Sequence, residues 1–183
     1  YLHHIADLLA RSNHGTIPTG EKIKVLDIGT GSSCIFSLIG TKTYGWSFVG
    51  YDIDPIGLAS AEEIIANNKD LRHVIQLRKQ NNPRNIFYGM FMKNELFDLT
   101  ICNPPFHASA EESVAASARK VSNLKGKKVT KPVLNFGGQN NELWCDGGES
   151  RFLRDMIFQS KQFALSCFWF SSSVSKQASL KGV

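Results

Sequence analysis

Short apolar runs alternate along this chain with segments whose apolar residues recur at helical spacing. The apolar runs predict strands at about 22–31, 46–55, 74–78, 97–102 and 163–172, the last of them fully buried. Helical periodicity predicts helices over 1–12, from Ser32 or Ser33 to about Gly40, over 55–68 and over 149–163. Strands that alternate with helices are typical of a parallel sheet with helices on both faces. The pattern therefore predicts a Rossmann-like, doubly wound α/β fold in a single domain spanning 1–183.

Composition narrows the class of protein only slightly. The chain has 183 residues, 42% of them hydrophobic, and a formal net charge of +5, which suits a polyanionic partner without requiring one. No apolar run approaches the roughly 18 residues of a membrane span, and no leader precedes the first helix, so a cytoplasmic protein is expected. The four cysteines are far apart, which predicts reduced thiols and no metal site. Because the chain begins at Tyr1 and ends in polar residues, we expect it to be a fragment.

The segment VLDIGTGSSC places two glycines directly after the first predicted strand. Glycine tolerates positive φ and lets the backbone approach a ligand, so Gly29 and Gly31 are candidate cofactor-binding residues. Asp27 is expected either to accept a hydrogen bond from the cofactor or to orient this loop. Cys34 stands where dinucleotide-binding motifs carry a third glycine, which argues against a dinucleotide. The segment resembles the first motif of class I S-adenosylmethionine-dependent methyltransferases, and this resemblance implies S-adenosylmethionine as cofactor.

Asp52 lies at the end of the second predicted strand. An acidic residue at this point accepts hydrogen bonds from ribose hydroxyls in Rossmann-like folds. The alternative is that Gly29 and Gly31 make an ordinary turn, and that Asp52 only caps the helix with Pro55 in its first turn. The Gly-x-Gly, the acid after strand two and the Asn-Pro-Pro after strand four occur in the order that favours the cofactor site.

The fourth predicted strand ends in NPPF, the Asn-Pro-Pro-aromatic motif of amino-methyltransferases, formed by Asn103, Pro104, Pro105 and Phe106. The residue before a proline is restricted to extended backbone, and both Asn103 and Pro104 precede prolines. The Asn103 side-chain oxygen and the Pro104 carbonyl are therefore expected to be two fixed acceptors. Such acceptors position a planar amino group for methyl transfer without a strong base. Phe106 is expected to stack on the base; the alternative is a proline-rich strand exit with Phe106 in the core.

Three longer blocks, CNPPFHASAEE, LNFGGQNNELWCDGGE and GTGSSCIFSLIG, extend the resemblance over nearly the whole chain. Together they resemble the bacterial ribosomal RNA large subunit methyltransferase F family. The resemblance implies methylation of the exocyclic N6 amino group of one adenosine, position 1618, in 23S ribosomal RNA or a large-subunit assembly intermediate. It also implies that Ser33, Asn82 and Asn103 contact the cofactor. Family members usually continue into a final helix and two further strands and carry an arginine just upstream of Tyr1, so we expect C-terminal strands to be missing here.

The segment 109–135 is too long for an ordinary connection between a strand and a helix. It is expected to be a mobile basic loop that either grips RNA phosphates or is simply solvated. The candidate RNA contacts in it are Arg119, Lys120, Lys125, Lys127, Lys128 and Lys131. His107 and Trp144 are further candidates, with a surface-loop histidine and a core tryptophan as the alternatives. The target adenine must leave any stack, so the pocket should take a flipped or single-stranded base.

Two other functions stay open from the residues alone. Asn-Pro-Pro-aromatic enzymes also methylate the amide nitrogen of protein glutamine, although their aromatic residue is typically tyrosine and they lack the FGGQNNELW block in that form. The second is an RNA-binding module that keeps the fold but has lost activity.

Overall fold

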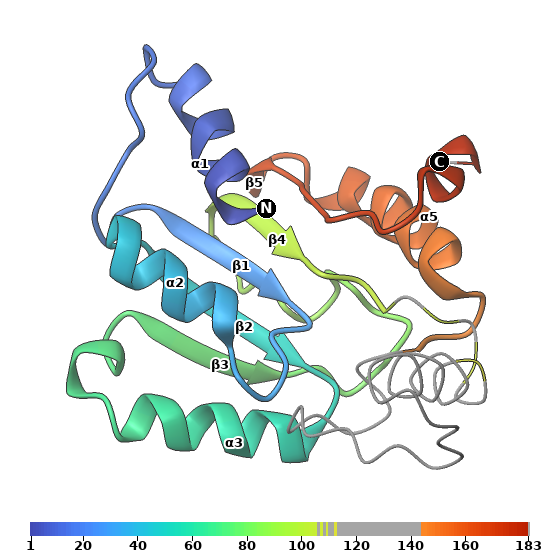
Figure 1. Cartoon of the computed structure of the whole chain (residues 1–183), viewed down its shortest axis with the longest axis horizontal. Helices are drawn as coiled ribbons and strands as arrows, with labels where there is room; N and C mark the ends of the chain where they lie inside the picture. The colour runs from blue at the N-terminus through green and yellow to red at the C-terminus, as the bar shows by residue number, and fades with distance from the viewer. Residues whose placement is uncertain (106, 108, 110–111, 113–143, 183) are drawn as a thin grey trace, which may run out of the picture.

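A computed structural model of the chain describes residues 1–105, 107, 109, 112 and 144–182. Five strands form one sheet in the order β3-β2-β1-β4-β5, and every neighbouring pair is parallel (Figure 1). The predicted parallel α/β sheet is thereby confirmed. The strands are β1 (Lys24–Ile28), β2 (Ser47–Asp52), β3 (Ile75–Lys79), β4 (Phe97–Cys102) and β5 (Cys167–Trp169).

The strand order reverses between β1 and β4. The chain builds outward from β1 to β2 and β3, and then returns to pair β4 with the other side of β1. In open parallel sheets, ligands bind beyond the carboxyl ends of the strands at this switch point. Residues that directly follow β1, β2 and β4 therefore stand where a ligand is expected.

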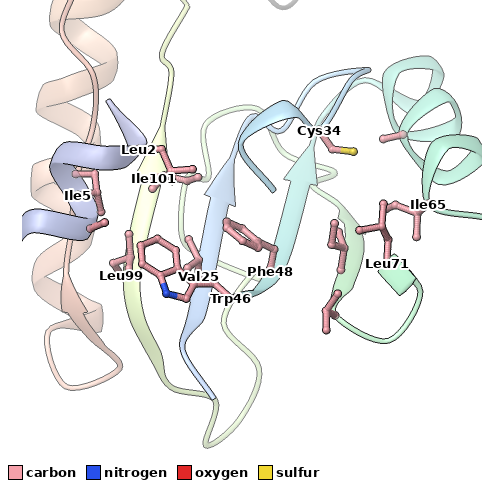
Figure 2. Packing of buried hydrophobic residues seen from close by; sticks show 14 of the residues in the cluster. Leu2, Ile5, Val25, Cys34, Trp46, Phe48, Ile65, Leu71, Leu99 and Ile101 are labelled. Atoms are coloured by element: carbon pink, nitrogen blue, oxygen red, sulfur yellow. The ribbon is translucent and has the colours of Figure 1, made fainter. Parts of the chain in front are cut away.

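One face of the sheet is covered by three helices, α1 (Leu2–Arg11), α2 (Ile35–Tyr44) and α3 (Pro55–Ala66). Figure 2 shows the α1 side chains Leu2 and Ile5 near Leu99 and Ile101 of β4. The centre of this core excludes solvent. Its side chains are at most 2% exposed, namely those of Val25, Trp46, Phe48 and Leu99. The apolar stripe of α1 thus explains why the first residues of the chain pack against the strand that precedes NPPF.

The opposite face is covered by α5 (Gly148–Ser160) and by the connection between β3 and β4, residues 80–96. This connection forms no helix, yet it sends Phe87 into the core with 0% exposure. The Phe87 ring lies 5.2 to 5.9 Å from the rings of Phe91, Phe163 and Phe170. Helices lie on both faces of the sheet, as the alternating pattern predicted.

Helix α2 begins and ends later than the sequence predicted. Its N-cap residue is Cys34, in left-handed conformation at φ +39° and without a side-chain cap hydrogen bond, so the predicted N-cap position at Ser32 or Ser33 is wrong. The helix also runs past Gly40 to Tyr44. Gly40 fits there because a Cβ at this position would lie 2.7 Å from the Phe48 ring atom Cε2. A close helix-to-strand contact, rather than a helix end, accounts for this glycine.

Strand β5 is shorter and more exposed than predicted. It has three residues, of which Cys167 is buried while Phe168 is 65% exposed. Nearby Leu165 is 96% exposed. The expectation of a fully buried strand is therefore wrong: among the described residues β5 is an edge strand, and an apolar run does not distinguish an edge from a centre. Three short 3-10 helices complete the described elements, η1 (Lys69–Leu71), η3 (Lys161–Phe163) and η4 (Gln177–Gly182).

The four cysteines are free thiols, three of them buried and Cys145 partly buried. Burial raises the pKa of Cys34 to about 11, which keeps this thiol protonated and unreactive. In the part of the chain that the structure describes, no helix has the length and apolar character to cross a bilayer. The predicted basic loop 109–135 lies outside the described residues, apart from Ser109 and Glu112.

Candidate active site

Three predicted site residues directly follow one rung of the sheet. Ile28 of β1 is the register partner of Tyr51 in β2 and of Cys102 in β4. The next residue along each strand is a predicted site residue, namely Gly29, Asp52 and Asn103. Because the strands are parallel, these residues leave the sheet at the same edge. The structure thus brings together the motifs that the sequence separates by 23 and 51 positions.

The loop after β1 turns through two glycines in left-handed conformation. Gly29 has φ +67° and Gly31 has φ +65°, values that other residues rarely adopt. The Thr30 N–H donates to the Tyr51 carbonyl over 3.0 Å, and the Gly31 N–H donates to Asp52 Oδ2 over 3.0 Å. The predicted positive-φ turn is confirmed, and its backbone is bonded to the end of β2.

Asp52 is a buried carboxylate, 6% exposed, that joins two loops. Its Oδ2 accepts the Gly31 N–H, and its Oδ1 accepts the Asp54 N–H over 3.0 Å. The helix cap is a different residue, because Asp54 Oδ1 accepts the Ile56 N–H at the start of α3. The alternative interpretation of Asp52 as a helix cap is therefore wrong. Each Asp52 oxygen retains a second lone pair for a hydroxyl donor.

Asp27, the second-last residue of β1, is 1% exposed and is hydrogen-bonded to the glycine loop. Its Oδ2 accepts hydrogen bonds from the hydroxyls of Thr30 and Ser37, each over 2.9 Å. Its Oδ1 is buried and has no hydrogen-bond partner among the described residues. Burial raises the pKa of this carboxyl to about 6, against the lowering effect of the two hydroxyls and with a smaller raising effect from the Asp52 charge. Asp27 therefore orients the loop, and its Oδ1 is a buried acceptor that no described residue bonds.

Gly50 supports the same loop and was missed by the sequence reasoning. A Cβ at this position would lie 2.9 Å from Thr30 Oγ1 and 3.1 Å from Leu77 Cδ2. Any side chain here would displace Thr30 and with it the hydrogen bond to Asp27. The available signal was a glycine in the interior of a strand, between Val49 and Tyr51.

Gln80 organises the loop after β3 and was also missed. It is 5% exposed; its N–H donates to the Asp52 carbonyl over 2.9 Å, and its Nε2 donates to the Tyr88 carbonyl over 2.9 Å. Its Oε1 accepts the Asn82 N–H, and Asn82 Oδ1 in turn accepts the Arg84 N–H over 3.0 Å. Predicted Asn82 therefore stands exposed in a turn at the same sheet edge as Asp52. Predicted Ser33 is likewise exposed, in the turn that precedes α2.

The NPPF motif begins where β4 ends. Asn103 is exposed, Pro104 is buried and Pro105 is half-buried, whereas Phe106 lies outside the described residues. Asn103 Oδ1 accepts a hydrogen bond from the Ser173 hydroxyl over 2.9 Å. The predicted acceptor oxygen is therefore held by a side chain from the far end of the chain, which no local pattern indicated.

The backbone N–H and the carbonyl of Cys102, the residue before Asn103, are both hydrogen-bonded. The Cys102 N–H donates to the Tyr1 hydroxyl over 3.2 Å, and the Cys102 carbonyl accepts the Ser173 N–H over 2.8 Å. The Tyr1 hydroxyl also lies 2.8 Å from Ser171 Oγ. Since the Ser171 hydroxyl donates to the Thr100 carbonyl, Tyr1 must donate to Ser171. Burial raises the pKa of Tyr1 to about 12, which keeps that donor protonated.

His107 and Trp144 lie side by side, joined by an isolated parallel bridge. The His107 carbonyl accepts the Cys145 N–H over 3.0 Å, and His107 Nδ1 lies 3.8 Å from Glu112 Oε1. Both residues are half-buried: His107 is less exposed than a surface-loop histidine, and Trp144 is more exposed than a core tryptophan. The remaining predicted RNA contacts, Arg119, Lys120, Lys125, Lys127, Lys128 and Lys131, lie outside the described residues.

Comparison with known proteins gives close relatives over the full chain. The "Ribosomal RNA large subunit methyltransferase F" of Cytophaga hutchinsonii is 57% identical over 181 residues, covering 99% of this chain and 56% of that protein. The protein of the same name from Pseudomonas putida is 52% identical over 186 residues, covering 100% of this chain and 58% of that protein. The chain therefore spans just over half the length of these relatives.

Solved structures resemble the chain in fold and, more distantly, in sequence. The hMettl16 catalytic domain in complex with MAT2A 3'UTR hairpin 1 has a TM-score of 0.68 and 28% identity, covering 86% of this chain and 52% of that one. The N-terminal domain of human METTL16 in complex with SAH has a TM-score of 0.66 and 22% identity, covering 97% of this chain and 55% of that one, and shows the fold alone. A family model described as RNA methyltransferase matches residues 1–183. The resemblance read from the sequence is thus confirmed, and the chain belongs to this RNA methyltransferase family.

Proposed function

We propose that this chain carries the methyl-transfer site of an S-adenosylmethionine-dependent RNA methyltransferase, acting on the exocyclic N6 amino group of adenosine 1618 in 23S ribosomal RNA. The observation that carries the proposal is the single rung after which Gly29, Asp52 and Asn103 follow. The shared register supports the proposal, because the residues expected to bind the cofactor, its ribose and the substrate amino group all leave the sheet at one edge. The names of the relatives support ribosomal RNA as the substrate class.

The residues present fit S-adenosylmethionine. This cofactor, when bound, supplies an electrophilic methyl group on a sulfonium. Its ribose hydroxyls are donors that match the free lone pairs of Asp52, and its ammonium group matches the buried, unpartnered Oδ1 of Asp27. A Cβ at Gly29 would meet no atom within 4 Å, so space lies above the turn. Asn82 and Ser33 at the same edge are the further candidates for cofactor contact.

Asn103 and Pro104 supply the chemistry of the acceptor side. The amino lone pair of adenine is delocalised into its ring, so the nitrogen attacks poorly while it is planar. Hydrogen bonds from its two N–H groups to Asn103 Oδ1 and the Pro104 carbonyl hold the nitrogen and favour its pyramidal, partly positive form. Phe106 stacks on the base in this proposal. As the bond from this nitrogen to the methyl carbon formed, the bond from methyl to sulfur would break with its electron pair left on sulfur, giving neutral S-adenosylhomocysteine. The nitrogen would then be positively charged and would lose one proton to water.

The RNA partner is either free 23S RNA or a large-subunit assembly intermediate, met in the cytoplasm where ribosomes are built. The basic residues of 109–135 would bind phosphates and give a salt-dependent affinity. The target base would enter flipped or single-stranded, with His107 and Trp144 beside the NPPF loop.

The test is methyl transfer from labelled S-adenosylmethionine to an unmodified 23S fragment containing adenosine 1618, with a glutamine-containing release-factor peptide as competitor. Asn103→Ala should lower the transfer rate about 10²- to 10³-fold, the usual effect of removing one preorganised hydrogen-bond partner of the reacting group. Asn67→Ala, at an exposed asparagine after α3, is the matched control and should leave the rate unchanged. Label in the peptide instead of the RNA would indicate glutamine methylation. RNA binding with no transfer at all would indicate an inactive RNA-binding module.

A further inference from the structure

The register of β4 and β5 continues beyond the end of β5. Within the sheet, Phe97 pairs with Cys167 and Leu99 with Trp169. The same separation of 70 residues joins Asn103 to Ser173. The segment after β5 therefore follows the edge of β4 as far as the first residue of the NPPF motif.

Backbone and side-chain bonds hold this segment in place. The Ser171 N–H donates to Thr100 Oγ1 over 3.0 Å, and the Ser171 hydroxyl donates to the Thr100 carbonyl over 2.6 Å. Two residues on, the Ser173 N–H donates to the Cys102 carbonyl over 2.8 Å. The backbone hydrogen bond thus fixes the position of Ser173, and the Ser173 hydroxyl is not needed for it.

The far end of the segment is fastened to α5. Glu149, which is 4% exposed in the first turn of α5, accepts the Ser175 N–H and the Ser179 hydroxyl, each over 2.6 Å. Residues 171–179 are therefore bonded at one end to β4 and at the other to a helix. A hydroxyl carried between two such anchors can restrict the side chain that it contacts.

That hydroxyl donates to Asn103 Oδ1 over 2.9 Å. Asn103 is exposed, so this hydrogen bond restricts a side chain that would otherwise change rotamer freely. An amino group of the substrate needs the acceptor oxygen at one fixed place. Because an amide oxygen has two lone pairs, it can accept from Ser173 and still accept from the substrate.

We propose that Ser173 is a positioning residue, whose hydroxyl holds the Asn103 side chain in the rotamer that places Oδ1 beside the reacting amino group. This role rests on the proposed function, because it assigns Ser173 an effect on the rate of transfer through Asn103. A serine that served only the fold would act through its backbone N–H, which the substitution Ser173→Ala leaves intact.

The experiment compares the full chain with Ser173→Ala, Ser173→Thr and the control Ser172→Ala, whose hydroxyl donates to the Ser173 carbonyl rather than to Asn103. Single-turnover methyl transfer to the 23S fragment should fall roughly five- to tenfold in Ser173→Ala, as expected for one neutral hydrogen bond. The dissociation constants for RNA and for S-adenosylhomocysteine should change less than twofold. Ser173→Thr should recover the rate, and Ser172→Ala should retain it.

A second measurement does not depend on activity. The side-chain NH₂ signals of Asn103, assigned by their loss in Asn103→Ala, should be sharp in the unchanged protein and in Ser173→Thr, and broadened in Ser173→Ala. An unchanged rate in Ser173→Ala, an equal loss in Ser172→Ala, or sharp Asn103 signals without the serine would each overturn the positioning role. If the unchanged protein methylates no RNA, the proposed function fails, while the amide signals still decide whether Ser173 orders Asn103.

Discussion

Replacing Asp27 with asparagine separates the structural role of this residue from its charge. Asp27→Asn keeps an oxygen that can accept from Thr30 and Ser37, as Asp27 Oδ2 now does over 2.9 Å. It replaces the buried Oδ1, which has no partner among the described residues, by an NH₂ group. The geometry of the loop should therefore survive while the buried negative charge disappears.

The size of the effect follows from the pKa of Asp27, which burial raises from 3.8 to about 6. The folded protein keeps this proton at a higher pH than the unfolded chain does, so stability falls as pH rises from about 4 to about 6 and is level above that. At about 1.4 kcal/mol for each pKa unit, the total is about 3 kcal/mol. The asparagine lacks this loss but buries an unbonded NH₂ at a cost of about 1–3 kcal/mol. Relative to the unchanged protein, the variant should thus gain about 3 kcal/mol between pH 4 and pH 7.

Urea unfolding of both proteins at several pH values from 4 to 8 measures this difference directly. The control is Asp70→Asn, which removes the same charge from a side chain that is 83% exposed. At pH 7.5 the Asp27→Asn variant should also bind S-adenosylhomocysteine about tenfold or more weakly, since a charge-assisted hydrogen bond contributes about 1.5–3 kcal/mol. A stability difference between variant and unchanged protein that stays constant from pH 4 to pH 8 would refute the reasoning.

Two further predictions concern stability. Glu95 has a side chain that is 8% exposed and lies 2.7 Å from Arg78 and 2.6 Å from Lys24, so Glu95→Gln should lower the unfolding free energy by about 3 kcal/mol at pH 7. Burial alone would raise the pKa of Glu95, but hydrogen bonds from these two cations lower it to about 2. The difference in unfolding free energy between variant and unchanged protein should therefore shrink as pH falls from 4.5 toward 2. Urea titrations that show the full difference still present at pH 2.5 would contradict this account. Gly40→Ala should cost about 1–3 kcal/mol despite the better helix propensity of alanine, because its Cβ would meet the Phe48 ring. Thermal unfolding should show Phe48→Leu to be less harmful in the Gly40→Ala background than alone, and additive effects would exclude the clash.

Much of the candidate site could be predicted because its residues lie at the carboxyl ends of the apolar runs that became strands. Gly29 and Asn103 directly follow β1 and β4, Asp52 is the last residue of β2, and parallel strands bring such positions to one edge. The order of the strands did not need to be known for this inference. Hydrophobic patterning was therefore enough to show on which edge of the sheet the motifs meet, once their residues had been recognised.

The supporting residues could not be predicted, because their roles depend on pairing across long separations. Ser173 reaches Asn103 only through the register of β4 and β5, and Tyr1 reaches Cys102 only because α1 packs beside β4. The burial of β5 was predicted wrongly for a related reason. An apolar run indicates a strand, but it does not show whether that strand has neighbours on both sides, and β5 has only β4 beside it among the described strands. Gly50 was overlooked because its neighbour Thr30 lies on another strand's loop.

The bonds around Cys102 and Asn103 also set the order in which this chain can mature during synthesis. The N–H of Cys102 is bonded by Tyr1, which is synthesised before β4, whereas its carbonyl and the Asn103 side chain are bonded by Ser173, which is synthesised after β5. Strands β1 to β3 and their helices form from a continuous stretch and can assemble early, since nearby segments pair faster than distant ones. A nascent chain that ends before residue 173 has its sheet but not its anchored asparagine. The hydrogen bond from Ser173 to Asn103 can therefore form only after the five described strands have been synthesised.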